Sequence, residues 1–356
     1  MIRSIGIKNF RSFKDVAIDR CPRINIIVGE NGSGKTALLE ALFLAVGASP
    51  EIAMRTRAWR GVESERLSGS FEDIHRALFA DLFHKFQTRR SAIVSLKGAG
   101  QENRSVTIKF HPPGQRRAVP PSRRQSGAPP KLVPERSPVE FQWKIEGRIA
   151  FTAAAELHDG KLTFPSAPES IVRASFFASN RTPPSLEMAN RFSLLSRTFR
   201  HEKFIQQFSD LYPNISDLSV EVDTGAPMLF AKVGDLPEKI PLSLASGGMS
   251  KLAAILLSMP HQPGGLILVD EIENGLYYKR LPMVWRAIIE FAREYDCQIF
   301  ASTHSEECLD AAATLAEKNP DEFSIIRTIL RDGETKVRQF GGDKFIDAMD
   351  ENIEIR

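Results

Sequence analysis

Cysteines are scarce in this sequence, and their spacing excludes two classes of small scaffold. The three cysteines are Cys21, Cys297 and Cys308, and no CxxC pair occurs. A disulfide framework or a structural zinc site would need paired or closely spaced cysteines, so neither is supported. We therefore expect the protein in a reducing compartment, the cytoplasm.

Long apolar runs are missing as well. No run approaches the ~18 apolar residues of a transmembrane helix, and the N-terminal MIRSIGIKNFRSF lacks the apolar stretch of an export signal. Sustained heptads are absent, which excludes a long coiled-coil arm. The net charge of the 356 residues is only +3, so the composition as a whole does not require a nucleic-acid partner. We expect a globular protein with no membrane association.

Positive charge is concentrated in one segment, residues 111–138. This segment holds eight of the 22 prolines, and its six Lys and Arg residues against one Glu give it a charge of +5. It has almost no large apolar side chains and cannot bury enough surface to offset the entropy of ordering it. We expect a flexible loop, and two interpretations stay open: a solvated insertion, or an arm that touches nucleic acid or a partner.

The first two thirds of the chain mix strand and helix patterns. An apolar run predicts a strand at Ile24–Val28, and apolar residues at helical spacing predict a helix from Lys35 to Val46. A helical pattern also covers Leu186–Leu211. Period-two alternation predicts an antiparallel β lobe with strands at 92–96, 106–110, 141–145, 149–157 and 161–164.

The last third alternates helices with short, wholly apolar strands. Helices are predicted at Ser246–Met259, ended by Pro260, and at Leu281–Ala292, with strands at Leu266–Val269 and Gln298–Ser302. Fully apolar strands between helices are typical of a parallel sheet covered on both faces. The strand before Gly29 must belong to the same sheet.

One eight-residue loop matches the phosphate-binding pattern GxxxxGK[ST]. It lies between an apolar strand and an amphipathic helix, the context that the pattern requires. Glycines let backbone N–H groups curl around a β-phosphate, Lys35 reaches the β and γ oxygens, and the Thr36 hydroxyl can ligate Mg²⁺. The loop residues are Gly29, Glu30, Asn31, Gly32, Ser33, Gly34, Lys35 and Thr36.

Two further polar groups follow apolar strands of the predicted sheet. Asp270 and Glu271 end the strand Leu266–Val269, where ligands bind in open α/β sheets. We expect Asp270 to hold the hydration shell of Mg²⁺ and Glu271 to polarise the attacking water. His304 follows the strand Gln298–Ser302, and from that edge it could bond the γ-phosphate or orient the water.

The residues Ser246, Gly247 and Gly248 open a helix, with Ser246 placed to cap it. This terminus is a second anion-binding helix end, separate from the phosphate loop. Within one chain it would need another anion. Across a dimer it would close on the γ-phosphate of ATP held by the other copy.

The order GENGSGKT, SGGMSKL, LILVDE, THS resembles the ABC-type ATPase superfamily. The opening IKNFRSFKDVAID, followed by INIIVGENGSGKTALLEAL, is similar to its RecF, SMC and OLD branch. The resemblance implies an α/β P-loop ATPase head with a mixed-sheet core, an antiparallel β lobe and an inserted helical and β-rich subdomain. It also implies that Arg11 contacts the nucleotide, that Glu271 is the catalytic carboxylate, that His304 is the switch histidine and that Ser246–Gly248 acts in trans.

The resemblance covers about 160 residues and suggests a division of the chain. We expect the ATPase core at residues 1–47 and 240–356, and an inserted lobe at 48–239 that carries the basic loop. Tyr277 stands where many relatives have histidine, and the glutamine of the Q-loop cannot be placed, although Gln87 is in about the right region. Only 52 residues follow His304 and none forms a DxD pair, so we expect a stand-alone ATPase without the Toprim nuclease domain of the OLD proteins.

The leading hypothesis is an ATP- and Mg²⁺-dependent switch that forms a homodimer around ATP and acts on a separate effector protein, as in bacterial antiviral defence or toxin control. An alternative is a DNA-binding ATPase of DNA repair or DNA-end sensing that uses residues 111–138. A third, the nucleotide-binding subunit of a transporter, is disfavoured by the NFRSF opening.

Overall fold

A computed structural model describes most of the chain. The described residues are 1–47, 50–59, 71–99, 102–111, 139–154, 156–158, 161–163, 174–179, 181, 183–223 and 225–350. The predicted basic loop, apart from His111, lies outside them. Among the described residues, no helix is both long and apolar enough to cross a bilayer.

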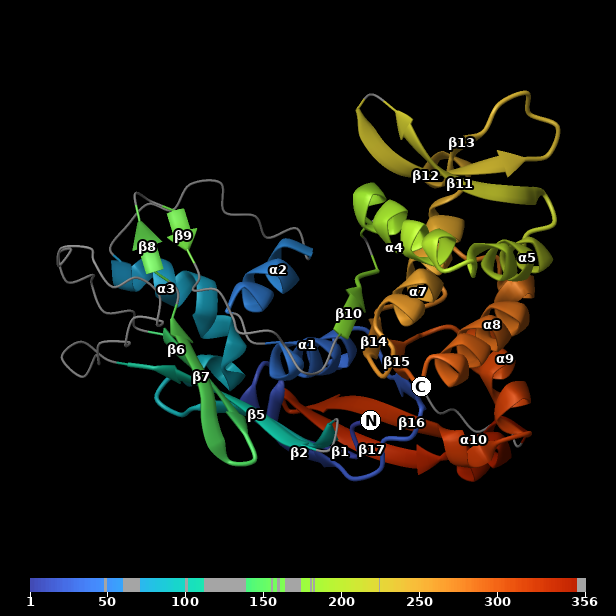
Figure 1. Ribbon diagram of the computed structural model, residues 1–356. Helices are drawn as coiled ribbons and strands as arrows, with labels where there is room; N and C mark the ends of the chain where they lie inside the picture. Colours follow the sequence, from blue (N-terminus) through green and yellow to red (C-terminus); the bar gives the residue numbers. More distant parts are fainter. Residues whose placement is uncertain are drawn as a thin grey trace.

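The central sheet has six strands in the order β10-β14-β15-β3-β16-β17 (Figure 1). Its first five strands are parallel, and β17 is antiparallel to β16. The predicted mixed sheet that contains the strand before Gly29 is therefore confirmed. The strands are β3 (Ile24–Val28), β10 (Ala174–Phe177), β14 (Leu266–Val269), β15 (Gln298–Ser302), β16 (Phe323–Arg331) and β17 (Glu334–Gly341).

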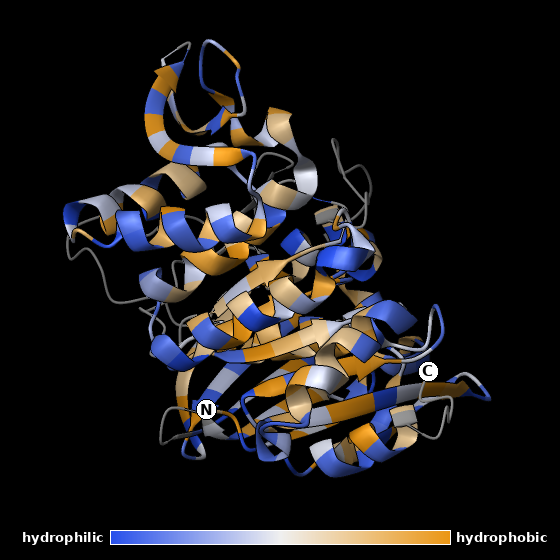
Figure 2. Cartoon of the chain, turned by 90° about the vertical axis from the view of Figure 1, so that its right-hand side faces the viewer, coloured by the Kyte–Doolittle hydropathy of each residue, from blue (hydrophilic) through white to orange (hydrophobic). Residues whose placement is uncertain are grey.

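Both faces of this sheet are buried, because its apolar strands have a covering layer on each side. Ile26 of β3 packs into one core with the helices α7 (Gly247–His261), α8 (Leu281–Glu294) and α9 (Glu306–Ala316). Its neighbour Ile27 packs into a second core with α1 (Lys35–Val46) and an antiparallel sheet. Figure 2 shows the hydrophobic colours concentrated on the strands in the middle of the molecule.

The antiparallel sheet joins two distant parts of the chain. Its order is β2-β1-β4-β5-β6-β7, and β1 pairs with β4 through Ile7 and Val94. The Trp143 indole N–H donates to the Leu44 carbonyl at 3.0 Å, which ties the sheet to α1. The strands are β1 (Ser4–Phe10), β2 (Phe13–Ile18), β4 (Ala92–Ala99), β5 (Glu102–Phe110), β6 (Val139–Ile145) and β7 (Arg148–Ala154), and a ribbon of β8 (Glu156–His158) and β9 (Lys161–Thr163) follows.

The strands of the predicted lobe thus continue a sheet that β1 and β2 begin, and β10 enters the central sheet. The division into a core of 1–47 and 240–356 and a lobe of 48–239 stays a prediction. The lobe also contains α2 (Glu51–Trp59), α3 (Phe71–Phe79), η1 (Ala80–Leu82) and η2 (His84–Phe86).

The helical pattern at Leu186–Leu211 is interrupted rather than continuous. Helix α4 (Ser185–Arg197) and helix α5 (His201–Leu211) are separated at Thr198, whose hydroxyl donates to the Leu194 carbonyl, and at Phe199, whose φ is +56°. A small sheet follows, made of β11 (Ile215–Asp223), β12 (Ala226–Val233) and β13 (Ile240–Pro241), and then α6 (Leu242–Ala245).

The prediction that Pro260 ends its helix is wrong. Helix α7 continues to His261, because Pro260 lies in the last turn, where a missing N–H removes a single helical bond. The remaining elements are η3 (Tyr278–Arg280), η4 (Pro320–Glu322) and α10 (Gly342–Asp350).

Candidate functional site

The loop from Gly29 to Lys35 connects β3 to α1. Gly29 has φ +143°, and a Cβ there would lie 2.3 Å from the Thr328 carbonyl oxygen, so the position accepts only glycine. Helix α1 begins at Lys35 after Gly34, and no side chain caps its first turn. Its orphan N–H groups and positive dipole end are therefore available to an anion.

The β16–β17 hairpin holds this loop from behind. The hydroxyls of Ser33 and Thr328 lie 2.7 Å apart, and the Thr335 hydroxyl donates to the Ser33 carbonyl at 2.8 Å. Thr328 also donates to the Val28 carbonyl at 3.1 Å. Sequence reasoning missed both threonines, because they lie about 300 residues after the loop and carry no motif of their own.

Lys35 is folded back over the loop that precedes it. Its ammonium donates to the carbonyls of Gly29 at 2.6 Å and Glu30 at 3.0 Å. Burial lowers the pKa of Lys35, and the nearby carboxylates of Asp270 and Glu271 oppose that shift. The ammonium group thus faces the space above the loop, where a phosphate would compete with these two carbonyls for its N–H groups.

Asp270 and Thr36 face each other across the mouth of the loop. The Thr36 hydroxyl lies 3.0 Å from Asp270 Oδ2, and the Ser302 hydroxyl donates to Asp270 Oδ1 at 2.6 Å. A hydroxyl beside a carboxylate is an oxygen donor set, which fits Mg²⁺. Among the described residues no three His, Cys, Asp or Glu side chains form a metal-holding group, so phosphate and water would supply the other ligands.

Glu271 follows in an unusual backbone conformation with φ +45°. Its N–H donates to the Ser302 hydroxyl at 2.9 Å, and its carbonyl accepts from Lys251 Nζ at 2.6 Å. Such a strained position persists only when its surroundings hold it, and strain of this kind is frequent at functional sites.

Lys251 is a site residue that sequence reasoning missed. It lies on α7, is almost fully buried and also donates to the Asp270 carbonyl at 3.2 Å. Burial lowers the pKa of Lys251 to about 8, although Glu273, Asp270 and Glu271 oppose the shift. The available signal was one lysine at the start of the apolar helical run LAAILL.

Arg11 lies in a buried ion network beside the loop. Its guanidinium pairs with Asp81, and its Nε lies 3.2 Å from Glu40 of α1. Asp81 also binds Arg57 of α2, with 2.8 Å between Nη1 and Oδ2. Arg11, which was predicted to contact the nucleotide, is therefore held at the edge of the loop by carboxylates of the protein itself.

The phosphate loop, the start of α1 and the carboxylates of Asp270 and Glu271 line a cleft of about 350 Å³. Eight predicted site residues meet there, while Gly29 and Ser33 belong to the same loop and are turned towards Thr328. Asp81 was not predicted and lines the cleft as well. The eight are Arg11, Asn31, Gly32, Gly34, Lys35, Thr36, Asp270 and Glu271.

His304 is not among the described residues that line this cleft. Its backbone N–H and its Nδ1 lie 3.0 and 3.1 Å from Glu273 Oε1, and its side chain is about half exposed. Gln87 also lies away from the cleft, at the end of η2, where its carbonyl accepts from Asn9. The exposed ring of Tyr277 packs against Tyr278.

The helix terminus at Ser246–Gly248 is also outside the cleft of its own chain. Ser246 caps α7 by accepting from the Met249 N–H at 3.4 Å. Among the described residues, a Cβ on Gly247 would meet no atom within 4 Å, whereas one on Gly248 would meet the Gly275 carbonyl oxygen at 1.9 Å. One face of this terminus is therefore packed and the other is open.

Comparisons with known proteins place the chain in a family of ATPases. Residues 24–310 match the family model described as "AAA domain, putative AbiEii toxin, Type IV TA system". An "ATP/GTP phosphatase" of Helicobacter pylori is 25% identical over 342 residues, 87% of each chain. A shorter match joins 43 residues to the "DNA replication and repair protein RecF" of Idiomarina loihiensis, at 54% identity over 12% of each chain.

Solved structures share the fold at low sequence identity. The SMC head bound to the C-winged helix domain of ScpA superposes with a TM-score of 0.60 and 16% identity, over 97% of this chain and 99% of that one. An SMC head from Pyrococcus furiosus, bound to the C-terminal domain of ScpA, gives 0.57 and 15% over 99% of each chain. Both confirm the predicted fold class of an ATPase head.

Proposed function

The chain belongs to the "AAA domain, putative AbiEii toxin, Type IV TA system" family and is an ABC-type ATPase of the RecF and SMC kind, and from this premise we propose that it is an ATP-driven switch. Two copies close around two ATP molecules, each held between the phosphate loop of one copy and the α7 N-terminus of the other. Hydrolysis reopens the pair and passes the change to a partner.

One observation carries this proposal. The Ser246–Gly248 terminus lies outside the phosphate cleft of its own chain, and a Cβ on Gly247 would meet no atom of the described residues within 4 Å. A helix terminus capped by serine and open at its first glycine offers N–H groups to an anion. A second copy brings that terminus to the phosphate that the loop of the first copy holds.

The cleft residues divide the work of hydrolysis. Lys35 leaves its loop carbonyls to bind the β and γ oxygens, and Asp270 with Thr36 would hold Mg²⁺, which supplies charge neutralisation on the phosphates. Glu271, placed one residue beyond Asp270, orients and polarises the attacking water. His304 reaches the γ-phosphate when its bond to Glu273 breaks on closure.

A cross-linking experiment tests the two-copy geometry. All three native cysteines are buried, so cysteines introduced by Asn31→Cys and Gly247→Cys are the reactive pair. We expect a bismaleimide to join two chains in the Glu271→Gln background with ATP and Mg²⁺, giving a species of double mass on a denaturing gel. Adding Lys35→Ala should abolish it. A product of single-chain mass, or a dimer that ignores ATP, would refute the arrangement.

A turnover assay tests the role of Glu271 separately. We expect Glu271→Gln to bind ATP and lose at least about a hundredfold in turnover, since a positioned base contributes that much or more. The matched control is Glu290→Gln, an exposed carboxylate on α8. Wild-type turnover by Glu271→Gln would make the base assignment wrong.

The switch needs something to act on, and we propose an effector protein of a bacterial defence or toxin system. The description of the family names a toxin of a type IV system, and the SMC heads of the same fold are bound to ScpA domains. These statements concern other proteins, and they support a partner protein as the receiver of closure. Cytoplasmic location and dependence on Mg²⁺ belong to the same proposal.

The alternative is a DNA-binding ATPase that acts in DNA repair. The short RecF match and the +5 charge of residues 111–138 favour it. Binding to duplex DNA should then weaken steeply with salt, and neutralising the six basic residues should reduce the salt slope. DNA binding that does not respond to salt, or an unchanged slope, would reject this alternative.

A further inference from the structure

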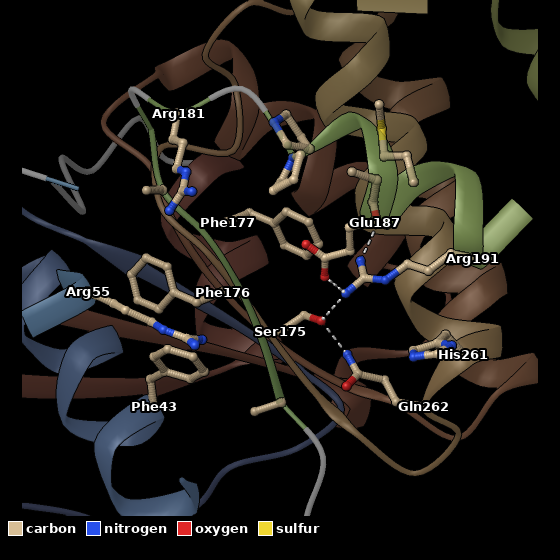
Figure 3. A pocket seen from close by; sticks show the side chains of 16 residues that line it. Phe43, Arg55, Ser175, Phe176, Phe177, Arg181, Glu187, Arg191, His261 and Gln262 are labelled. Carbon is tan, nitrogen blue, oxygen red and sulfur yellow. Dashed lines mark hydrogen bonds and ion pairs between the residues drawn. The ribbon is translucent and has the colours of Figure 1, made fainter. Parts of the chain in front are cut away.

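A second cavity, larger than the phosphate cleft, lies at the edge of the central sheet. Its volume is about 540 Å³, within the range of roughly 300–1,000 Å³ that small-molecule sites have. It is bordered by α1, α2, strand β10, the connection to α4, α4 itself and the end of α7 (Figure 3).

Three arginines from three different elements face this cavity. Arg55 comes from α2, Arg181 from the β10–α4 connection and Arg191 from α4, whereas Glu187 is the one carboxylate among the described residues of the lining. Figure 3 shows the three guanidinium groups on different sides of the same space. Arg55 pairs with Glu51 at 3.0 Å, but an exposed pair on one helix contributes little to stability and would yield to a ligand.

Arg191 gives the cavity a built polar wall. It is 92% buried, and its guanidinium contacts Glu187 and donates to the Ser175 hydroxyl at 3.2 Å. Gln262 donates to the same hydroxyl at 2.5 Å, and Arg191 Nε has no hydrogen-bond partner among the described residues. Burying a charged group in this way is costly, and the single half-exposed carboxylate of Glu187 compensates only part of that cost.

The opposite wall is aromatic. The rings of Phe43 and Phe176 lie 5.5 Å apart and tilted, and Figure 3 shows Arg55 beside both. Aromatic rings next to cations suit a ligand with a planar body and an anionic group.

We propose that this cavity binds a small organic phosphate with a planar aromatic body, the phosphate on the arginines and the ring against Phe43 and Phe176. A nucleotide and a non-nucleotide aryl phosphate share this chemistry. Neither the phosphate loop nor the helix terminus takes part in the site.

Strand β10, which lines the cavity, pairs with β14, the strand before Asp270. Two further hydrogen bonds join the segments that follow these strands. The Asp270 N–H donates to the Phe177 carbonyl at 2.8 Å, and the Asn274 side chain donates to the Ser179 carbonyl at 2.9 Å. Phe43 also lies on α1, the helix that begins with Lys35. A ligand that shifts β10 or the connection after it changes the position of Asp270, so occupancy regulates ATP turnover. This second step rests on the proposed ATPase function, whereas binding does not.

Binding is tested with the full chain carrying Lys35→Ala, which disables the phosphate cleft. The probes are phenyl phosphate, AMP and inorganic phosphate, measured by calorimetry. We expect one phenyl phosphate per chain, with inorganic phosphate at least about tenfold weaker because it lacks the ring. Stronger binding of AMP than of phenyl phosphate assigns the site to a nucleotide, and the reverse to an aryl phosphate. Equal binding of inorganic and phenyl phosphate overturns the proposal.

Variants of the lining locate the site. The exposed pair Arg55→Gln with Arg181→Gln, which should fold normally, and separately Arg191→Met, should each weaken phenyl phosphate about tenfold or more. Arg286→Gln on the exposed face of α8 is the matched control. Unchanged affinity in the Arg55 and Arg181 double variant overturns the proposal, whatever the fate of Arg191→Met.

The coupling between the cavity and ATP hydrolysis is measured in the wild-type chain. We expect phenyl phosphate to change kcat for ATP and leave KM unaltered, and the effect should vanish in the Arg55 and Arg181 double variant. If phenyl phosphate bound without any change in kcat, the proposed coupling would be overturned, while the proposed binding site would stand. If the chain failed to hydrolyse ATP at all, the proposed function would fail while the calorimetric result stood.

Discussion

The backbones of Gly248 and Gly275 are in direct contact, so that a Cβ on Gly248 would lie 1.9 Å from the Gly275 carbonyl oxygen. The first turn of α7 and the turn after Glu271 are therefore one packed unit. A shift at the helix terminus must move the segment that follows the catalytic strand. Through this contact, binding at the α7 N-terminus would shift the segment that carries Asp270 and Glu271 of the same chain.

We expect Gly248→Ala to destabilise the protein and Gly247→Ala to leave its stability unchanged. The first change forces a backbone shift that costs on the order of 1–3 kcal/mol, and the second meets open space. Thermal unfolding of the two variants measures the difference. Equal melting temperatures for the two variants would contradict the contact.

Asp81 and Arg11 should have opposite effects on nucleotide affinity. Asp81 places a negative charge at the edge of the cleft and holds Arg11, so Asp81→Asn should free that cation and lower the Kd for ATP several-fold. Arg11→Ala should raise the Kd and leave Glu40 with less compensation. Binding of a fluorescent ATP analogue measures both, with Asp296→Asn on the surface as control. A weaker affinity in Asp81→Asn would contradict this assignment.

How much of this site the sequence predicts depends on how local each relationship is. Strand β3, the phosphate loop and α1 are contiguous in the sequence, so their pattern predicts both the local structure and the phosphate-binding role. Asp270 meets Thr36 because parallel strands of one sheet present their carboxyl ends at one edge, which topology makes predictable. Asp81 and Arg57 reach Arg11 through non-local packing that leaves no periodic signal in the sequence.

Two further differences between the sequence-based expectations and the structure also arise from non-local packing. The pairing of β1 with β4 joins residues about 90 positions apart, and no turn chemistry marks it. His304 follows its predicted strand as expected, but its Nδ1 lies next to Glu273, a charge that a strand pattern does not place. Sequence patterns thus identified the strands and helices that carry the predicted site residues, whereas the pairs that hold the side chains came only with the fold.

Lys251 makes the free energy of unfolding depend on pH above neutrality. Burial lowers its pKa to about 8 in the folded state, whereas an unfolded lysine titrates near ~10.4. Between these values the unfolded chain binds more protons, so stability rises with pH. We expect Lys251→Met to remove a gain of roughly 1–3 kcal/mol between pH about 8 and about 10.

The comparison must be a difference between variant and wild type. Burial raises the pKa of Cys21, Cys297 and Cys308, which lowers stability above the ordinary thiol pKa and opposes the lysine. Urea unfolding at several pH values measures the difference curve. A difference that does not change with pH would show that Lys251 is charged at no cost in the folded state.

The hydroxyl of Thr328 should matter for nucleotide binding although it lies behind the loop. Thr328→Val keeps the shape and removes the bond to Ser33 and the bond to the Val28 carbonyl. Because both partners are buried, we expect a loss of about 1–3 kcal/mol in stability. The loop also loses a support, so KM for ATP should rise several-fold with a smaller change in kcat. Thr314→Val, an exposed hydroxyl on α9, is the matched control. A change confined to kcat would mean that Thr328 acts on the chemical step and not on the shape of the loop.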